Sequence, residues 1–186
     1  MEKKFDNSML VETDWLAKNH KNSNIRIFDC TVWLVPHPEK IYTIVSGRKD
    51  YDLDHIPNSD FLDINDISQK NTPLPFMMPD DNTFDKIMSS KGVGKNTHVV
   101  LYSRENIQWA TRVWWMLRSM GFNNASILNG GYDRWKIENR ATTTDTNIYP
   151  LNTFKSNPKE GYFCSKEEVK EQLTNNNISI INALRS

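Results

Sequence analysis

Residues 103–108 form the part of this sequence best suited to chemistry. They follow an apolar stretch, His98–Tyr102, that predicts a buried strand, and they precede Trp109–Met120, which predicts an amphipathic helix. A strand that turns through a short loop into a helix directs backbone N–H groups and the positive helix end toward one point. Such a point suits a nucleophile or an anion. The loop residues are, in order, Ser103, Arg104, Glu105, Asn106, Ile107 and Gln108.

The first loop position, where a cysteine nucleophile would stand, holds Ser103. A catalytic serine needs a base, but His98 lies on the incoming strand, and a Gly-x-Ser-x-Gly elbow is absent. We therefore expect an anion-binding loop without its reactive atom. A cysteine placed at position 103 is expected to have a lowered thiol pKa, because the loop N–H groups, the helix end and Arg104 favour a thiolate, with Glu105 opposing them.

The sequence contains two cysteines, Cys30 and Cys164, in separate segments. Cys30 follows the predicted strand Ile25–Asp29 and should lie at the same sheet edge as the 103–108 loop. It is the alternative nucleophile, although a small buried residue is the simpler interpretation. The cysteines form no CxxC motif and no zinc-type cluster with histidine, so we expect no metal and no cofactor.

The composition and net charge of the chain argue against some kinds of binding partner. The 23 basic and 23 acidic residues cancel, so no bulk charge draws the chain to nucleic acid or to a membrane surface. No apolar run approaches the ~18 residues of a membrane span. The N-terminus lacks a secretory signal, and two widely separated cysteines suit a reducing compartment. These features together predict a cytoplasmic protein.

Strands and helices alternate along most of the chain, which predicts an α/β fold with a mostly parallel sheet. Thr31–Tyr42, which contains two prolines, is expected to be a loop. After the short apolar start at Met9–Val11, the expected strands are Ile25–Asp29, Phe61–Ile64, His98–Tyr102 and Ala125–Leu128. The expected helices are Thr13–Asn19 with Thr13 as N-cap, a helix capped by Asn82 or Thr83 through Lys91, Trp109–Met120, and Tyr132–Asn139.

The chain is predicted to contain a domain at residues 8–140, a linker at 141–162 and a further fragment at 163–186. The linker is rich in Thr, Asn and Pro. The fragment repeats the opening of the domain, with a helix capped by Ser165 and a strand at Ile178–Ile181. We expect it to be the truncated start of a second domain and to be poorly ordered, because one helix and one strand cannot bury a core.

Four separate stretches resemble the amino-terminal half of a two-domain rhodanese, the family of thiosulfate and 3-mercaptopyruvate sulfurtransferases. They are Ile27–Leu34, Tyr51–Ser59 with its His-Ile-Pro core, Arg112–Arg118 and Leu128–Gly131. The resemblance implies a rhodanese-like, five-stranded and mostly parallel sheet with helices on both faces. It also implies that residues 163–186 are a short fragment of a second such domain.

In this family the loop cysteine carries sulfane sulfur as a persulfide, and in tandem members the working cysteine resembles that of the second domain. The resemblance thus implies a sulfurtransferase that takes sulfur from thiosulfate or 3-mercaptopyruvate, but is inactive as this isolated chain. The alternative is a non-catalytic rhodanese-type module that binds an anion or a protein. The implied partners are a small anionic sulfur donor and a separately encoded second rhodanese domain. Arg185 resembles, one position displaced, an arginine that holds the substrate carboxylate.

Overall fold

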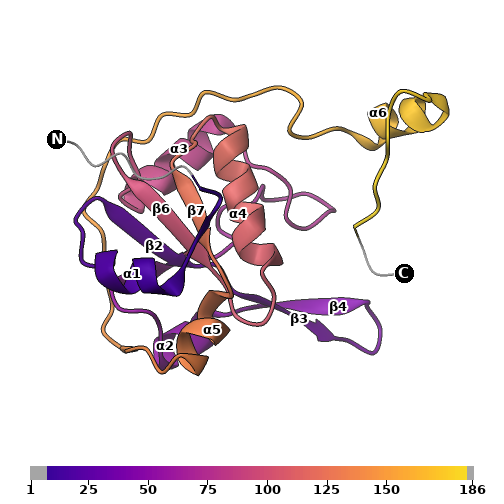
Figure 1. Ribbon diagram of the computed structural model, residues 1–186. Helices are drawn as coiled ribbons and strands as arrows, with labels where there is room; N and C mark the ends of the chain where they lie inside the picture. Colours follow the sequence, from indigo (N-terminus) through magenta and orange to yellow (C-terminus); the bar gives the residue numbers. More distant parts are fainter. Residues whose placement is uncertain (1–7, 184–186) are drawn as a thin grey trace.

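The computed structural model describes residues 8–183, which build a five-stranded parallel sheet covered on both faces (Figure 1). All residues of the three central strands are buried, as is usual where helices cover both faces of a parallel sheet. An α/β fold with a parallel sheet was predicted and is confirmed. In spatial order the strands are β1 (Leu10–Val11), β7 (Ala125–Leu128), β6 (His98–Tyr102), β2 (Ile25–Asp29) and β5 (Ser59–Phe61).

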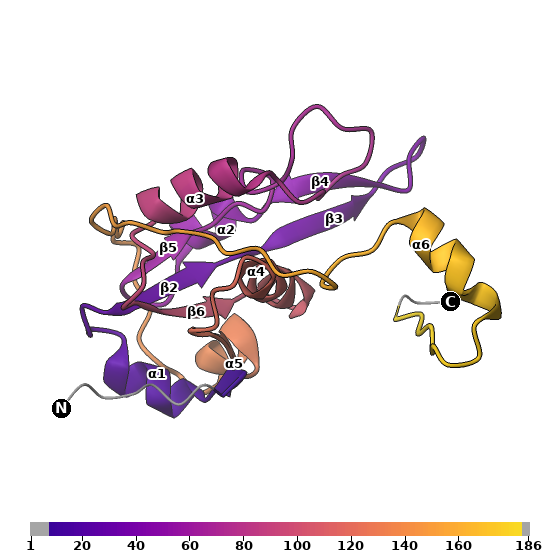
Figure 2. The ribbon, with the colours of Figure 1, turned by 90° about the horizontal axis from the view of Figure 1, so that it is seen from above.

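The helices divide between the two faces of the sheet (Figure 2). On one face, α1 (Thr13–Asn19) and α5 (Gly131–Ile137) enclose a cluster that includes Leu16, Trp135 and Tyr102. On the other, the larger cluster joins the inward side chains of two helices to β2, β6 and β7. These two helices are α3 (Asp81–Ser90) and α4 (Gln108–Ser119). The short α2 (Arg48–Leu53) precedes β5.

The predicted helix faces agree with the structure, and the predicted helix ends differ slightly. The apolar side chains that the amphipathic pattern of Trp109–Met120 places on one face are all buried: Ala110, Val113, Trp114, Leu117 and Met120. The N-cap of α3 is Asp80, whose carboxylate accepts the N–H of Thr83 at 2.9 Å. Thr13 lies inside α1, and its hydroxyl donates to Glu138 instead of capping its own helix.

The predicted loop at Thr31–Tyr42 was wrong, because this region forms an antiparallel arm that projects from the body (Figures 1 and 2). Its strands are β3 (Val32–Pro36) and β4 (Tyr42–Ser46). The prolines that suggested a loop lie at the end of β3 and in the turn, where no ladder hydrogen bond is lost. The strand predicted at Phe61–Ile64 is shifted toward the N-terminus: β5 begins at Ser59 and ends at Phe61, because its register with β2 runs from the pair Ile27–Ser59 to the pair Asp29–Phe61.

Residues 141–162, predicted to be a linker, run across the domain without regular secondary structure but with many contacts. His55 and Thr143 exchange backbone hydrogen bonds of 2.9 and 3.0 Å. The hydroxyl of Tyr149 accepts the N–H of Ile27 at 2.8 Å and donates to the Asn58 carbonyl at 2.5 Å. Phe154 is buried in the larger core cluster. The segment is thus fastened to the domain at several points, while its domain boundaries stay a prediction.

The final described segment lies away from the sheet (Figures 1 and 2). It contains α6 (Lys166–Glu171), whose predicted capping box between Ser165 and Glu168 is present, followed by a short 3-10 turn at Gln172–Thr174. The strand predicted at Ile178–Ile181 does not form. These isoleucines are exposed, and no described strand lies alongside to supply backbone partners.

Candidate functional site

The 103–108 loop lies at the carboxyl edge of the sheet, where β2 and β6 end side by side. Asp29 is in register with Tyr102, and the N–H of Cys30 donates to the Tyr102 carbonyl at 2.9 Å. Cys30 and Ser103 therefore follow neighbouring strands at the same edge, as the sequence predicted.

The Ser103 side chain is buried and engaged within its own loop. It is only 4% exposed, and its hydroxyl donates to the Asn106 carbonyl at 2.6 Å. His98 begins β6 and Ser103 follows its end, so strand β6 separates the two side chains. This histidine is therefore in no position to act as the base of a catalytic serine.

Several loop N–H groups already have acceptors within the protein. The N–H of Arg104 donates to the Thr31 hydroxyl at 3.1 Å, and that of Glu105 donates to the Asp133 carboxylate at 2.7 Å. The N–H of Gln108, at the start of α4, donates to the side-chain oxygen of Asn106 at 3.0 Å. The loop keeps the strand-to-helix geometry of an anion site, while its donors face protein oxygens.

Arg104 extends under the loop toward two acidic residues. Its guanidinium lies 3.5 Å from Asp29 and 3.3 Å from Asp54, and its Cζ lies 3.8 Å from the centroid of the Tyr132 ring. It also donates to the backbone carbonyls of Asp50 and Asp54. The positive charge expected to favour a thiolate at position 103 is thus compensated by these contacts.

Asp29 and Thr31 connect the end of β2 to the loop. The Thr31 hydroxyl donates to one Asp29 oxygen while it accepts the N–H of Arg104. The other oxygen, Oδ2, accepts no hydrogen bond from the described residues, and its nearest cation is Arg104. Burial raises the pKa of this carboxyl, because the charged form is desolvated.

Cys30 lies in the core and not in an open site. Its side chain is fully buried, and its thiol has only a weak contact of 3.8 Å with the Phe28 carbonyl. Burial, with the Asp29 carboxylate as a second cause, raises the pKa of the Cys30 thiol well above its ordinary value. A thiol in this position is a poor nucleophile, whereas Cys164 is exposed on the final segment.

A small cavity of about 230 Å³ lies between the loop and the turn into α5. Its lining includes Ser103, Glu105, Asn106, Gly131 and Asp133. The carboxylates of Glu105 and Asp133 form no ion pair with a lysine or arginine of the described residues. The cavity therefore has a negative lining beside the loop donors.

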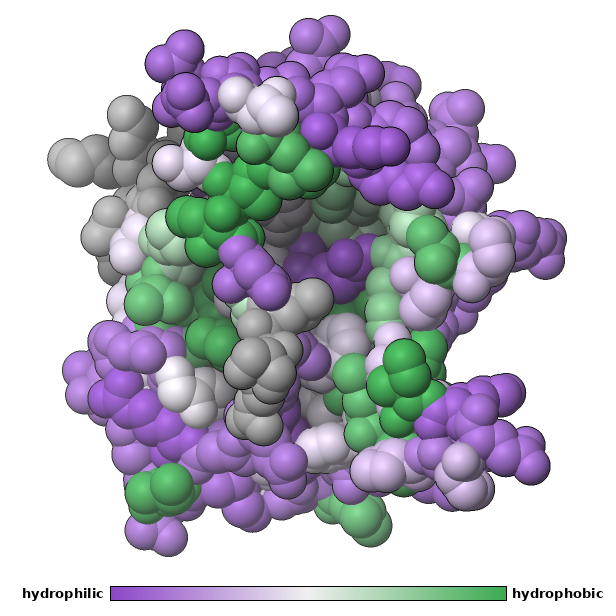
Figure 3. All heavy atoms as spheres, turned by 90° about the vertical axis from the view of Figure 1, so that its right-hand side faces the viewer, coloured by the Kyte–Doolittle hydropathy of each residue, from purple (hydrophilic) through white to green (hydrophobic). Residues whose placement is uncertain are grey.

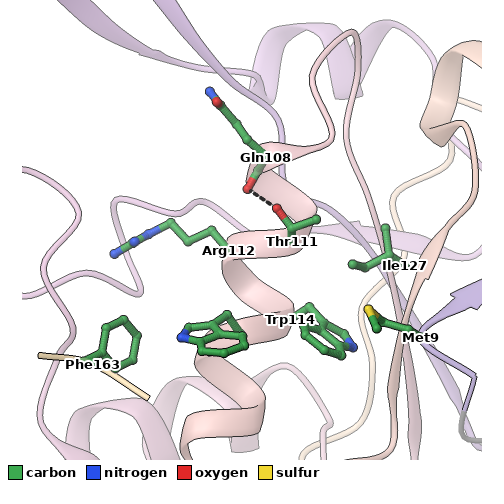
Figure 4. A pocket seen from close by; sticks show the side chains of 8 residues that line it. Met9, Gln108, Thr111, Arg112, Trp114, Ile127 and Phe163 are labelled. Atoms are coloured by element: carbon green, nitrogen blue, oxygen red, sulfur yellow. Dashed lines mark hydrogen bonds between the residues drawn. The ribbon is translucent and has the colours of Figure 1, made fainter. Parts of the chain in front are cut away.

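A larger, shallow pocket of about 380 Å³ lies over the outer side of α4. Trp115 and Phe163 are 41% and 50% exposed. Arg112 extends toward the side on which Phe163 lies, while Met9 and Ile127 lie on the opposite side (Figure 4). Seen from the side where the arm and the final segment project, the molecule is hollowed, with hydrophobic side chains around the hollow (Figure 3).

Arg112 is the unusual charged residue of this pocket. Its Nε is buried without a hydrogen-bond partner among the described residues, and its guanidinium is 5.9 Å from the Phe76 ring centroid. Burial lowers the pKa of this guanidinium, because the charged form is desolvated. No carboxylate of the described residues forms an ion pair with it. The α4 surface thus combines exposed aromatic rings with an uncompensated cation.

The sequence-predicted residues have different outcomes. The six residues of the 103–108 loop and Cys30 are brought to one sheet edge, and anion binding there stays a prediction. Arg185 lies outside the described residues. Two residues of this region were not predicted from the sequence: Asp133, which accepts the N–H of Glu105, and Thr31, whose hydroxyl connects Asp29 to the N–H of Arg104. The signal for Asp133 was its place two residues after the Gly130–Gly131 turn, which lies close to the loop.

Two further observations within residues 8–183 concern metal binding and membrane crossing. No group of three or more His, Cys, Asp or Glu residues is placed to hold a metal ion in this range. None of the helices in it has the length and apolar character needed to cross a membrane.

Comparison with known proteins identifies the family. A model of the rhodanese-like domain matches residues 12–138. The chain is 29% identical over 180 residues to the thiosulfate sulfurtransferase of Cricetulus griseus, covering 94% of this chain and 58% of that protein. It is 34% identical over 126 residues to the 3-mercaptopyruvate sulfurtransferase of Escherichia coli strain K12, covering 68% of this chain and 43% of that protein.

The fold is similar to the crystal structure of SseA from Escherichia coli, which is described as a 3-mercaptopyruvate sulfotransferase. The two agree with a TM-score of 0.78 and 28% identity, over 89% of this chain and 61% of that chain. The chain therefore spans less than two thirds of the length of each of these relatives. The parallel five-stranded sheet, the loop after β6 and the match over residues 12–138 lead to one conclusion: the chain belongs to the rhodanese family.

Proposed function

We propose that this chain provides the non-catalytic half of a sulfurtransferase, and that it is inactive by itself. The complete assembly would move sulfane sulfur from thiosulfate or 3-mercaptopyruvate to a thiophilic acceptor, the chemistry named for the relatives. One observation carries the proposal: the position after β6 holds the Ser103 hydroxyl, bonded to its own loop, and the neighbouring Cys30 thiol is buried. Neither group supplies an accessible thiolate to accept sulfur.

The catalytic thiol would come from a second rhodanese-like domain that packs against the outer side of α4. The exposed ring of Trp115, the ring of Phe163 and the apolar side chains beside them offer a surface that gains from burial. Arg112, which has no carboxylate partner among the described residues, would receive an acidic group from that domain. The small anionic sulfur donor would then bind at the active site of that domain.

A non-catalytic module that binds only an anion or a protein is the second candidate. The absence of an accessible thiol at the 103–108 loop favours it as well. The two functions differ in what the docked partner does. If the partner carries a reactive cysteine, the assembly transfers sulfur. If it does not, the surface over α4 serves binding alone.

Turnover assays test the first half of the proposal. The purified chain, assayed with thiosulfate and cyanide and separately with 3-mercaptopyruvate, should show only background activity. The variant Cys30→Ser should behave identically, because a buried thiol with a raised pKa contributes nothing to turnover. Robust turnover by the unchanged chain, lost in Cys30→Ser, would overturn the proposal and make Cys30 the nucleophile.

A docking experiment tests the second half. The part of the E. coli 3-mercaptopyruvate sulfurtransferase beyond the matched region is a suitable probe, with binding followed by calorimetry. Arg112→Met should weaken binding at least about tenfold, since it leaves the partner acid without a cation. The control is Ile137→Ser, which removes an apolar side chain that is 79% exposed on α5, away from this pocket. Equal effects of the two variants would contradict docking on α4.

The cytoplasm is the proposed location of the chain. Both cysteines are free thiols, and Cys164 is exposed, which suits a reducing compartment. Fractionation of cells with an antibody against the chain tests this location.

A further inference from the structure

The contact between α5 and the 103–108 loop places a carboxylate where this loop would hold an anion. The Oδ2 atom of Asp133 accepts the N–H of Glu105 at 2.7 Å, a distance typical of a hydrogen bond to a charged acceptor. Glu105 adopts a left-handed backbone conformation with a φ of 52°, and its N–H donates to the first turn of α5. The N–H of Glu105, a residue that lines the cavity beside the loop, is therefore used internally.

The close approach of α5 to the 103–108 loop depends on Gly131, which has no side chain. A Cβ added to Gly131 would lie 2.5 Å from the Ser103 carbonyl oxygen, and the φ of Gly131 is +58°. This close approach lets the N–H of Tyr132 donate to the same carbonyl at 3.1 Å. The first turn of α5 is thus fixed to the loop, and Asp133 is held within reach of the Glu105 N–H.

Two further loop donors are also occupied by protein acceptors, and the charge around the cavity disfavours an external anion. The Arg104 N–H is taken by Thr31 and the Gln108 N–H by Asn106. The cavity of about 230 Å³ is large enough for a small inorganic anion, but Asp133 and Glu105 line it. A second negative charge beside two carboxylates is disfavoured, because like charges in one site repel.

We propose that Asp133 is an internal ligand of the 103–108 loop, an autoinhibitory contact that occupies the anion position and excludes external anions. The loop is then a latent oxyanion site: its backbone is formed, and a side chain of the same protein fills it. Removal of the Asp133 charge with its shape retained should open the site to sulfate or thiosulfate. This inference goes beyond the proposed function, since it holds whether or not a second domain docks on α4.

The test uses the full chain, labelled with nitrogen-15, and follows the loop amides by NMR during titration with sodium thiosulfate and sodium sulfate. Asp133→Asn keeps the size of the side chain but removes the charged acceptor. Glu105→Gln is the matched control, because it removes the same charge from the same cavity and leaves the carboxylate that accepts the Glu105 N–H. The two variants therefore separate occupancy of the donor from simple repulsion.

We expect Asp133→Asn to bind thiosulfate at least about tenfold more tightly than the unchanged chain, with the largest shifts at Glu105 and Asn106. Glu105→Gln should gain clearly less.

Equal gains in the two variants would show that repulsion alone excludes anions, and this would overturn the proposal. An unchanged affinity in Asp133→Asn, with its loop amides otherwise in place, would also overturn it. The anion titrations measure binding to the isolated chain, so they are independent of the turnover and docking experiments. A failure here leaves the sulfurtransferase proposal intact, and the reverse is also true.

Discussion

The guanidinium of Arg104 lies 3.5 Å from the carboxylate of Asp29, which is fully buried at the end of β2. The pair joins the second residue of the 103–108 loop to the strand that neighbours it. A buried acid needs either a cation or a proton, because an isolated charge in the interior is strongly disfavoured. Arg104 therefore explains both the charge balance of this region and the fixed course of the loop.

Arg104→Met should destabilise the fold by about 3 kcal/mol at pH 7, because it leaves the Asp29 carboxylate buried without its cation. Burial already raises the pKa of Asp29, so its folded form takes up a proton at a higher pH than the unfolded chain does. The difference between variant and parent should therefore shrink as the pH falls through the folded pKa. Urea unfolding at pH 7 and pH 5, followed by tryptophan fluorescence, measures both effects.

The control for this prediction is Arg48→Met. Arg48 pairs with Asp52 on the exposed side of α2, at 2.7 Å, and such a pair contributes less than about 1 kcal/mol. A similar loss of stability in the two variants would show that the Arg104–Asp29 pair has no special role.

Glu138 should make the fold sensitive to acid. The hydroxyl of Thr13 and the guanidinium groups of Arg140 and Arg134 donate to its carboxylate and lower the pKa of Glu138 to about 2. A depressed pKa contributes stability that is present above the unfolded value of 4.5 and is lost as the pH falls through the folded value. The stability difference between the parent and Glu138→Gln should therefore be largest near neutral pH and decrease from pH 4.5 toward pH 2.

Glu39→Gln is the control for the acid effect, because Glu39 is exposed and forms no ion pair with the described residues. The Glu39→Gln variant should be as stable as the parent near neutral pH. Chemical unfolding at several pH values decides the matter, and a pH-independent difference for Glu138→Gln would contradict the prediction.

Tyr149→Phe should cost about 1–3 kcal/mol, because it leaves the N–H of Ile27 in the central strand β2 without an acceptor. The same change removes the donor to the Asn58 carbonyl and so loosens residues 141–162. Tyr162→Phe is the matched control, since the hydroxyl of Tyr162 forms no hydrogen bond with the described residues. Thermal unfolding of the three proteins gives the comparison, and indistinguishable midpoints would show that the Tyr149 hydroxyl adds nothing to stability.

A cysteine at position 103 should react slowly with iodoacetamide, although the loop sequence alone predicts a lowered thiol pKa. Position 103 is buried, Arg104 is paired with Asp29 and Asp54, and the loop N–H groups have other acceptors. Burial without compensation raises a thiol pKa. In Ser103→Cys, iodoacetamide should therefore modify the exposed Cys164 first, with position 103 well behind.

The reactivity at position 103 is best measured in Ser103→Cys combined with Cys164→Ser, by mass spectrometry over a range of pH. Cys30, buried in the core, gives the internal reference for an inaccessible thiol. Rapid modification with a midpoint below about 8.5 would show that the loop still stabilises an anion.

Hydrophobic periodicity in the sequence was sufficient to predict most of the fold. Val113 and Leu117 of α4 and the continuous apolar run of β6 are buried, as their spacing requires. Apolar residues that recur about every 3.6 positions favour a helix with one buried face, and a short continuous apolar run favours a fully buried strand. The same local signals failed at the arm β3–β4, where prolines at a strand end and in the turn predicted a loop. They also failed at Ile178–Ile181, because a β-branched run becomes a strand only when another strand supplies backbone partners.

The sequence by itself determined the family, the strand-to-helix loop and the absence of a thiol at its first position, since each depends on residue type and order. Tertiary structure decided what the loop does with its donors and charge. Asp133 reaches Glu105, and Arg104 reaches Asp29, across separations of 28 and 75 residues along the chain. Such contacts arise only when packed elements bring distant backbone and side-chain atoms within a few ångströms, and no local pattern encodes them.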